Sequence, residues 1–77
     1  MNYVELNKII RECGIAEHNT ALTEYARRVA IMVDGREELL ESKLRPIMEE
    51  LALEGPVHEF MTLARRVRDK LVQRERI

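Results

Sequence analysis

Apolar residues recur every three or four positions through most of this chain, and residues that commonly end a helix interrupt the pattern at three places. The interruptions are Gly14, Asp34-Gly35 and Gly55-Pro56. A spacing of three and four gathers side chains on one face of an α-helix, whereas a half-buried strand would alternate. The sequence therefore predicts an all-α fold, a compact bundle of about four short helices. We expect these helices at residues 3–13, 20–33, 36–54 and 56–74.

Capping residues suggest where the predicted helices begin and end. Asn2 is a suitable N-cap for the first helix, and Asn19 or Thr20 can cap the second. Gly14 is expected to end the first helix, because glycine readily adopts the left-handed conformation that follows a helix. Asp34 is expected to cap the third helix after a tight turn.

The predicted core is read from the apolar stripe of each helix. In the third helix, Pro46 lies inside the stripe and removes one backbone hydrogen bond. We expect a kink there, with two shorter helices as the alternative. The inward-facing residues are predicted to be Tyr3, Leu6, Ile9, Ile10 and Cys13; Leu22, Tyr25, Ala26, Val29, Met32 and Val33; Leu40, Leu44, Ile47 and Leu51; and Val57, Phe60, Met61, Ala64, Val67 and Leu71.

The length of the chain limits how stable it can be alone. Its 77 residues suit one domain, residues 1–77, whose core buries only ~60% of the unfolded surface. Such a core supplies a few kcal/mol at most, so a homodimer or a docked protein partner is expected.

Composition bears on location and on whole classes of site. Cys13 is the only cysteine, which excludes an internal disulfide and a zinc site of paired thiols, and a reducing cytoplasm is the expected location. Neither a signal peptide nor an apolar run long enough to span a bilayer is present in the sequence, so no membrane contact is expected. With 14 acidic and 13 basic residues, the overall charge does not favour nucleic acid.

Enzymatic chemistry has little support in the sequence. His18 and His58 are far apart, and neither has metal-ligand spacing with another histidine, cysteine or carboxylate. Cys13 ends an apolar stripe, which is typical of a small buried side chain more than of a nucleophile. We therefore expect no catalytic residues, no metal and no cofactor.

Charge is unevenly divided between the third and fourth predicted helices. The third is rich in glutamate, whereas Arg66, Lys70 and Arg74 form a basic ridge at i, i+4 and i+8 on the fourth. Like charges at this spacing repel by roughly 0.2–0.5 kcal/mol per pair, so an anionic neighbour would be favourable. A solvated face is the simplest interpretation. The other candidates are phosphates, or carboxylates of the third helix, namely Glu38, Glu41, Glu49 and Glu50.

A second apolar line on the third predicted helix is the main candidate for partner binding. Leu39, Pro46 and Leu53 recur at seven-residue spacing opposite the core stripe, and Ile31 is out of phase with the stripe of the second helix. Apolar residues on two sides of a helix are typical of a helix between two partners. Scattered exposed leucines are the alternative.

Together these patterns predict a small non-enzymatic protein-interaction module, a regulator, adaptor or inhibitor of another protein. Leu39, Pro46, Leu53 and Ile31 would anchor the partner, and the basic ridge would orient it. The alternative is a small nucleic-acid-binding regulator that uses the fourth helix. The arginines of that helix point to several sides, whereas a DNA-reading surface more often gathers them on one stripe.

Overall fold

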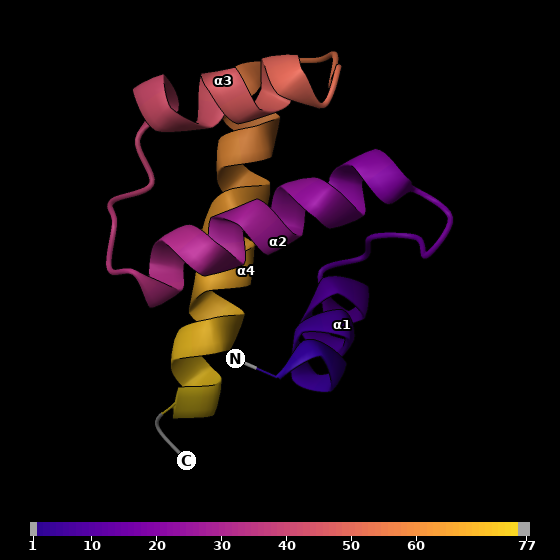
Figure 1. The fold of residues 1–77 in the computed structure, drawn as a ribbon, viewed down its shortest axis with the longest axis vertical. Helices are drawn as coiled ribbons and strands as arrows, with labels where there is room; N and C mark the ends of the chain where they lie inside the picture. Colours follow the sequence, from indigo (N-terminus) through magenta and orange to yellow (C-terminus); the bar gives the residue numbers. More distant parts are fainter. Residues whose placement is uncertain (1, 76–77) are drawn as a thin grey trace.

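The structure is a computed structural model that describes residues 2–75. Within this range the chain forms four helices and no strand, which confirms the predicted all-α class (Figure 1). The Cα radius of gyration is 11.6 Å, as expected for a compact chain of this length. The helices are α1 (Tyr3–Glu12), α2 (Thr20–Asp34), α3 (Glu41–Glu50) and α4 (Val57–Glu75).

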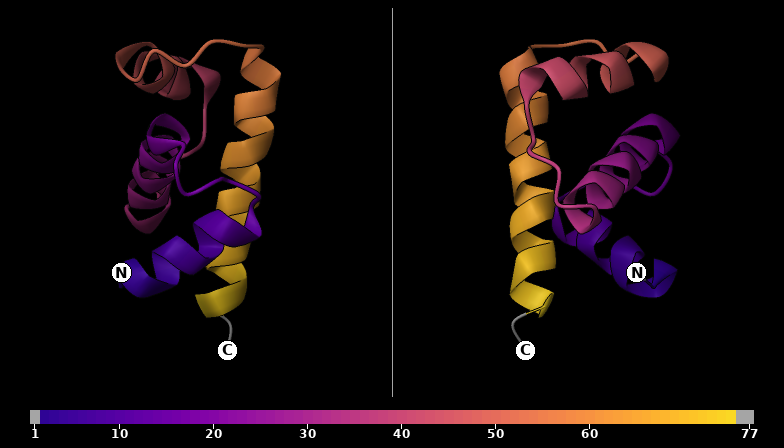
Figure 2. Two further views of the ribbon diagram at one scale, coloured as in Figure 1. Left: turned by 90° about the vertical axis from the view of Figure 1, so that its right-hand side faces the viewer. Right: turned by 60° about the vertical axis from the view of Figure 1, so that its left-hand side comes forward.

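Helix α4 is the longest helix, and each of the other three helices packs against it. Figure 2 shows α4 on one side of the molecule, with α1, α2 and α3 packed along its length on the other. Helix α2 crosses the middle of α4, α3 lies near its beginning and α1 near its end. The molecule is a flat slab of 34 × 28 × 17 Å, and α2 lies on one of its broad faces.

The core forms where the apolar stripes of the helices meet. Tyr25 is fully buried in α2, and its ring meets that of Phe60 edge to face at a centroid distance of 5.6 Å. Its hydroxyl donates a 2.8 Å hydrogen bond to the Phe60 carbonyl, and burial raises the pKa of Tyr25 to about 12. The other buried core residues are Leu6, Ile9, Ile10, Cys13, Ile15, Ala26, Val29, Ala30, Met32, Leu44, Met48, Ala64, Val67 and Leu71.

Helix α1 ends at Gly14, as the sequence predicts, in a Schellman turn. Asn2 caps its start by accepting a 2.8 Å hydrogen bond from the Val4 amide. At the other end, Gly14 has a φ of 82°, and the Ile15 amide donates to the Ile10 carbonyl at 3.3 Å. This turn buries Ile15 against the core and ends the helix next to α4.

Helix α2 ends in the same turn, but with arginine in the left-handed position. Arg36 has a φ of 59°, and the Glu37 amide donates to the Met32 carbonyl at 2.9 Å. Asp34 is therefore the last residue of α2, and its predicted role as the cap of the third helix is wrong. Leu40 occupies that N-cap position instead, without a side-chain hydrogen bond.

Helix α3 ends early for a similar reason. Ala52 has a φ of 54°, and the Leu53 amide donates to the Met48 carbonyl at 2.9 Å. The third helix predicted at residues 36–54 is thus ten residues long, Glu41–Glu50. Both boundaries were wrong because neither arginine nor alanine signals a left-handed turn in the way that glycine does.

The shorter α3 changes which side chains reach the core. Leu40 is 45% exposed rather than buried, whereas Met48 is buried. Leu44 has no exposed surface and lies in the core, where α3 packs against the other helices. In α1 the prediction also failed for Tyr3, which is 72% exposed. Both errors concern residues at the very start of a helix, where the neighbouring helices no longer cover the predicted stripe.

Pro46 lies inside α3, which continues through it, so the alternative of two separate helices is wrong.

Replacing Pro46 with alanine is expected to raise the free energy of unfolding by about 2 kcal/mol. The side chain is exposed, and alanine restores an amide that can donate to the Ser42 carbonyl. The loss of proline's restriction on the unfolded chain offsets part of the gain. Urea denaturation followed by circular dichroism measures the change.

The control for this substitution is Glu49→Ala, at another exposed position of the same helix. It should change stability by a few tenths of a kcal/mol only. Equal effects of the two substitutions would contradict the assigned cost of Pro46.

Candidate interaction surface

The basic ridge of α4 lies against the end of α1. The Arg74 guanidinium pairs with the Glu12 carboxylate at 3.0 Å, and the Lys70 ammonium pairs with the same carboxylate at 3.7 Å. Arg66 donates a long 3.5 Å hydrogen bond to the Cys13 carbonyl. The negative end of the α1 dipole points toward these cations. The anionic neighbour expected for Arg66, Lys70 and Arg74 is therefore α1 of the same chain.

The predicted pairing between α3 glutamates and the basic ridge is wrong for Glu41 and Glu50. Glu50 accepts two hydrogen bonds from Arg28 of α2, at 2.7 and 3.1 Å. These bonds lower the pKa of Glu50 and raise the pKa of Arg28. Glu41 pairs within its own helix, with Arg45 at 2.6 Å. The acidic face of α3 is thus turned toward α2 and solvent.

The apolar line predicted on the third helix is divided by the true bounds of α3. Leu39 precedes the helix and Leu53 follows it, and both are half-buried against the core of the chain itself. Pro46 remains on the helix and is exposed. The three residues therefore do not form one helical stripe, because the seven-residue spacing is helical only while the helix continues. Their role in partner binding stays a prediction.

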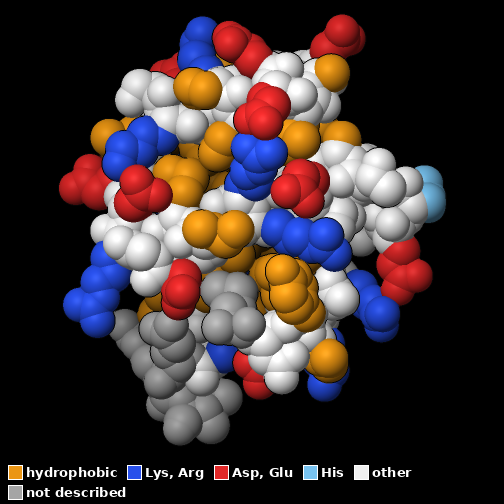
Figure 3. Space-filling view, in the orientation of Figure 1, with side chains coloured by type: hydrophobic (Ala, Val, Ile, Leu, Met, Phe, Trp, Pro, Cys, Tyr) orange, Lys and Arg blue, Asp and Glu red, His pale blue; other side chains and the backbone are white. Residues whose placement is uncertain are grey.

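Ile31, the fourth predicted anchor, is 69% exposed on the outer side of α2. Next to it lies Tyr3 at the start of α1, and a hollow of about 290 Å³ opens between the two helices. We call this region the α1–α2 face. Figure 3 shows the broad side of the slab that carries α2, where apolar side chains reach the surface among charges of both signs. The α1–α2 face is lined by Tyr3, Leu6, Glu24, Arg27 and Ile31.

Glu24 and Arg27 supply the polar part of this face. The Arg27 guanidinium lies 3.8 Å from the Glu24 carboxylate, and both side chains are about 40% exposed, at 38% and 42%. The same Glu24 carboxylate lies 3.6 Å from Arg28, which forms a shorter, 2.7 Å ion pair with Glu50. Arg27 is therefore only loosely paired within the chain.

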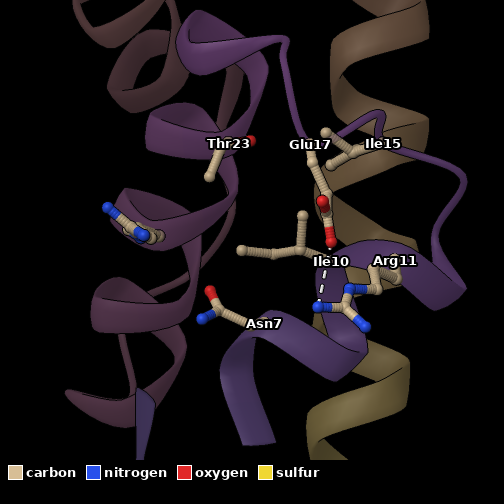
Figure 4. Close-up of a pocket in the computed structure, with 7 residues that line it drawn as sticks. Asn7, Ile10, Arg11, Ile15, Glu17 and Thr23 are labelled. Atoms are coloured by element: carbon tan, nitrogen blue, oxygen red, sulfur yellow. Dashed lines mark ion pairs between the residues drawn. The ribbon is translucent and has the colours of Figure 1, made fainter. Parts of the chain in front are cut away.

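A second hollow, of about 180 Å³, shares Arg27 with the first. Figure 4 shows the residues that line it. Arg11 and Glu17 form a 2.9 Å ion pair at its edge. Thr23 Oγ1 and Arg27 Nε are buried beside it without a hydrogen-bond partner among residues 2–74, and a ligand could reach neither atom without moving side chains. With its main charges paired and its unpaired atoms covered, this hollow is the weaker candidate for binding. It is lined by Asn7, Ile10, Arg11, Ile15, Glu17, Thr23 and Arg27.

A third hollow contains Leu53 and lies between the start of α2 and the start of α4. Its apolar residues, Leu22, Leu53, Phe60 and Leu63, are only partly buried but already pack against the core. Large, highly exposed apolar side chains are found on the α1–α2 face instead, at Tyr3 and Ile31. We therefore regard the α1–α2 face as the best-formed candidate surface.

Three further observations concern chemistry and membranes. Among the described residues, no group of three histidine, cysteine, aspartate or glutamate side chains is placed to hold a metal ion. Burial raises the pKa of the Cys13 thiol, although Arg66 and Lys70 oppose the shift. No helix between residues 2 and 75 is long and apolar enough to cross a membrane.

Comparisons of the chain with protein-family models, with curated proteins and with solved structures found no match. The surface of the chain itself is therefore the basis for inferring its function. Sequence reasoning included Ile31 in that surface but assigned Tyr3 to the core. The exposure of Tyr3 could have been predicted from its position. Tyr3 is the first residue of α1, and the first turn of a helix is often left uncovered by its neighbours.

Proposed function

We propose that this chain is a small protein-interaction module that binds a protein partner through the α1–α2 face and carries out no catalytic step. The observation that carries the proposal is the pair Tyr3 and Ile31, 72% and 69% exposed, beside one apolar hollow. Exposed apolar side chains that gather around a hollow are typical of binding surfaces, and tyrosine is enriched in them. The nearby Glu24 and Arg27 would form the polar rim.

The engaged basic ridge weakens the nucleic-acid alternative. Lys70 and Arg74 already face the Glu12 carboxylate, so binding to phosphates would have to compete with these contacts. We also propose a cytoplasmic location, in which the buried free thiol of Cys13 would stay reduced.

Capture of partners from the native cell tests the proposal. The tagged chain should retain a set of proteins that Ile31→Glu loses, because a buried charge at the centre of an apolar contact is costly. Val4→Glu is the matched control, since Val4 is 61% exposed but does not line the hollow. Mass spectrometry with and without nuclease identifies what is retained.

The result that supports the proposal is a protein set kept by Val4→Glu, lost by Ile31→Glu and insensitive to nuclease. Circular dichroism must show both variants folded. Retention of the same set by Ile31→Glu would reject the α1–α2 face. Loss of the whole set on nuclease treatment would favour the nucleic-acid alternative, with the basic ridge as the next site to mutate.

A further inference from the structure

Asp34 occupies an electrostatically unfavourable position. It is the last residue of α2, where the helix dipole disfavours an anion, and the last turn of α2 contains no basic residue. Its side chain is exposed and makes no ion pair with residues 2–74. On the same helix, Arg27 is held only loosely, 3.8 Å from Glu24. Helix α2 therefore presents one unpaired anion and one loosely paired cation.

Helical geometry relates both charges to Ile31. At ~100° per residue, Arg27 and Asp34 lie on the same side of Ile31, about 20° apart around the helix axis. At ~1.5 Å per residue, Arg27 lies about 6 Å before Ile31 and Asp34 about 4.5 Å after it. The cation and the anion are thus at nearly equal distances in opposite directions. Arg28 lies on the other side of Ile31, where Glu50 holds it.

A twofold axis beside Ile31 would bring these charges together. When two copies of a helix pack antiparallel around such an axis, a residue before the centre faces the residue equally far after it in the other copy. The axis also keeps each residue on the same lateral side. Arg27 would then face Asp34 of the second copy, and the reciprocal pair would form by symmetry.

We propose that the partner of the α1–α2 face is a second copy of this chain, packed antiparallel through α2 with Ile31 at the twofold axis. Two reciprocal Arg27–Asp34 ion pairs fix the register, and Tyr3 packs beside the apolar centre. This inference rests on the proposed function, since it names the partner of the same face. The charges favour a second copy over an unrelated protein because the face carries both members of the ion pair at matching offsets.

The shape of the chain agrees with this arrangement. The slab is 17 Å thick, and its broad side with α2 is the one that would be covered (Figures 1 and 3). Two slabs joined there would form a particle about as thick as each is long. A chain of 77 residues gains core from such a contact, since a small domain buries a smaller fraction of its surface.

Charge exchange tests the register. Sedimentation equilibrium of the full chain should show a dimer, and Asp34→Arg should raise its dissociation constant about tenfold or more, because arginine would face Arg27 of the other copy. Arg27→Glu should do the same. The double variant Arg27→Glu/Asp34→Arg should restore dimerisation to near the original level. Asp34→Arg places a cation at the C-terminal end of α2, where the helix dipole stabilises it, so this variant should fold well. Circular dichroism verifies folding for every variant.

Arg65→Glu is the matched control, a charge reversal at an exposed arginine on α4 that should leave the dissociation constant unchanged. A monomer up to millimolar concentration would overturn the proposal, as would single reversals without effect or a double variant that fails to recover. If the chain is monomeric but Ile31→Glu still loses captured proteins, the proposed function stands and this inference fails.

Discussion

Replacing Tyr25 with alanine is expected to lower the free energy of unfolding by about 3–5 kcal/mol, as for other aromatic residues removed from a core. Tyr25 is fully buried, packs edge to face on Phe60 and donates a 2.8 Å hydrogen bond to the Phe60 carbonyl. A single core in a chain of this length rarely supplies more than roughly 3–5 kcal/mol of net stability. The variant should therefore unfold at much lower urea concentration, as measured by circular dichroism.

Two controls separate the contributions of the ring. Tyr3→Ala removes the same side chain from a site that is 72% exposed, and should change monomer stability by less than about 1 kcal/mol. Tyr25→Phe keeps the ring and removes the hydroxyl, so it should cost about 1 kcal/mol. The measurements are made at low protein concentration to exclude self-association. Similar costs for Tyr3→Ala and Tyr25→Ala would contradict the assigned core.

Replacing Leu44 with alanine is the second large effect, with an expected loss of about 2–5 kcal/mol. Leu44 has no exposed surface and is the central contact of α3 with the core. The side chains of a ten-residue helix cannot readily rearrange to fill the cavity, and so short a helix is not stable by itself. Urea denaturation measures the loss, and hydrogen exchange would show whether α3 opens first.

Leu40→Ala is the matched control for this substitution. Leu40 is 45% exposed at the N-cap of α3, so its removal should cost about 1 kcal/mol or less. The comparison also tests the start of α3. If Leu40→Ala were as destabilising as Leu44→Ala, Leu40 would belong to the buried stripe that the longer predicted helix requires.

The sequence predicted the helical class and most of the core, because the three-to-four spacing of apolar residues reports directly on which side of a helix is buried. The ends of a helix were predicted correctly where a capping side chain or a glycine marks them in the sequence. Asn2 and Gly14 act at the ends of α1 as expected. At Arg36 and Ala52 the left-handed turn is imposed by the fold against the preference of the side chain, and no sequence signal marked it.

The surface was harder to predict than the core. The basic ridge was identified correctly as a row of cations, but its partner, Glu12, belongs to α1 rather than to the neighbouring predicted helix. Which helices lie side by side depends on the tertiary arrangement, and periodicity within one helix carries no information about it. The same limit applies to Leu39 and Leu53. They are partly buried against the chain's own core, which periodicity did not predict, and their role at a partner surface stays a prediction.

The contact between Glu12 and Arg74 joins residues 62 positions apart in the chain. Helix α1 therefore cannot complete its packing during synthesis until nearly all of α4 has left the ribosome. Until then, Ile9 and Ile10 lack part of the apolar surface that covers them in the finished fold. Until α4 has been made and has left the ribosome, the apolar face of α1 is therefore open to chaperones and to aggregation, and the docking of α4 covers it.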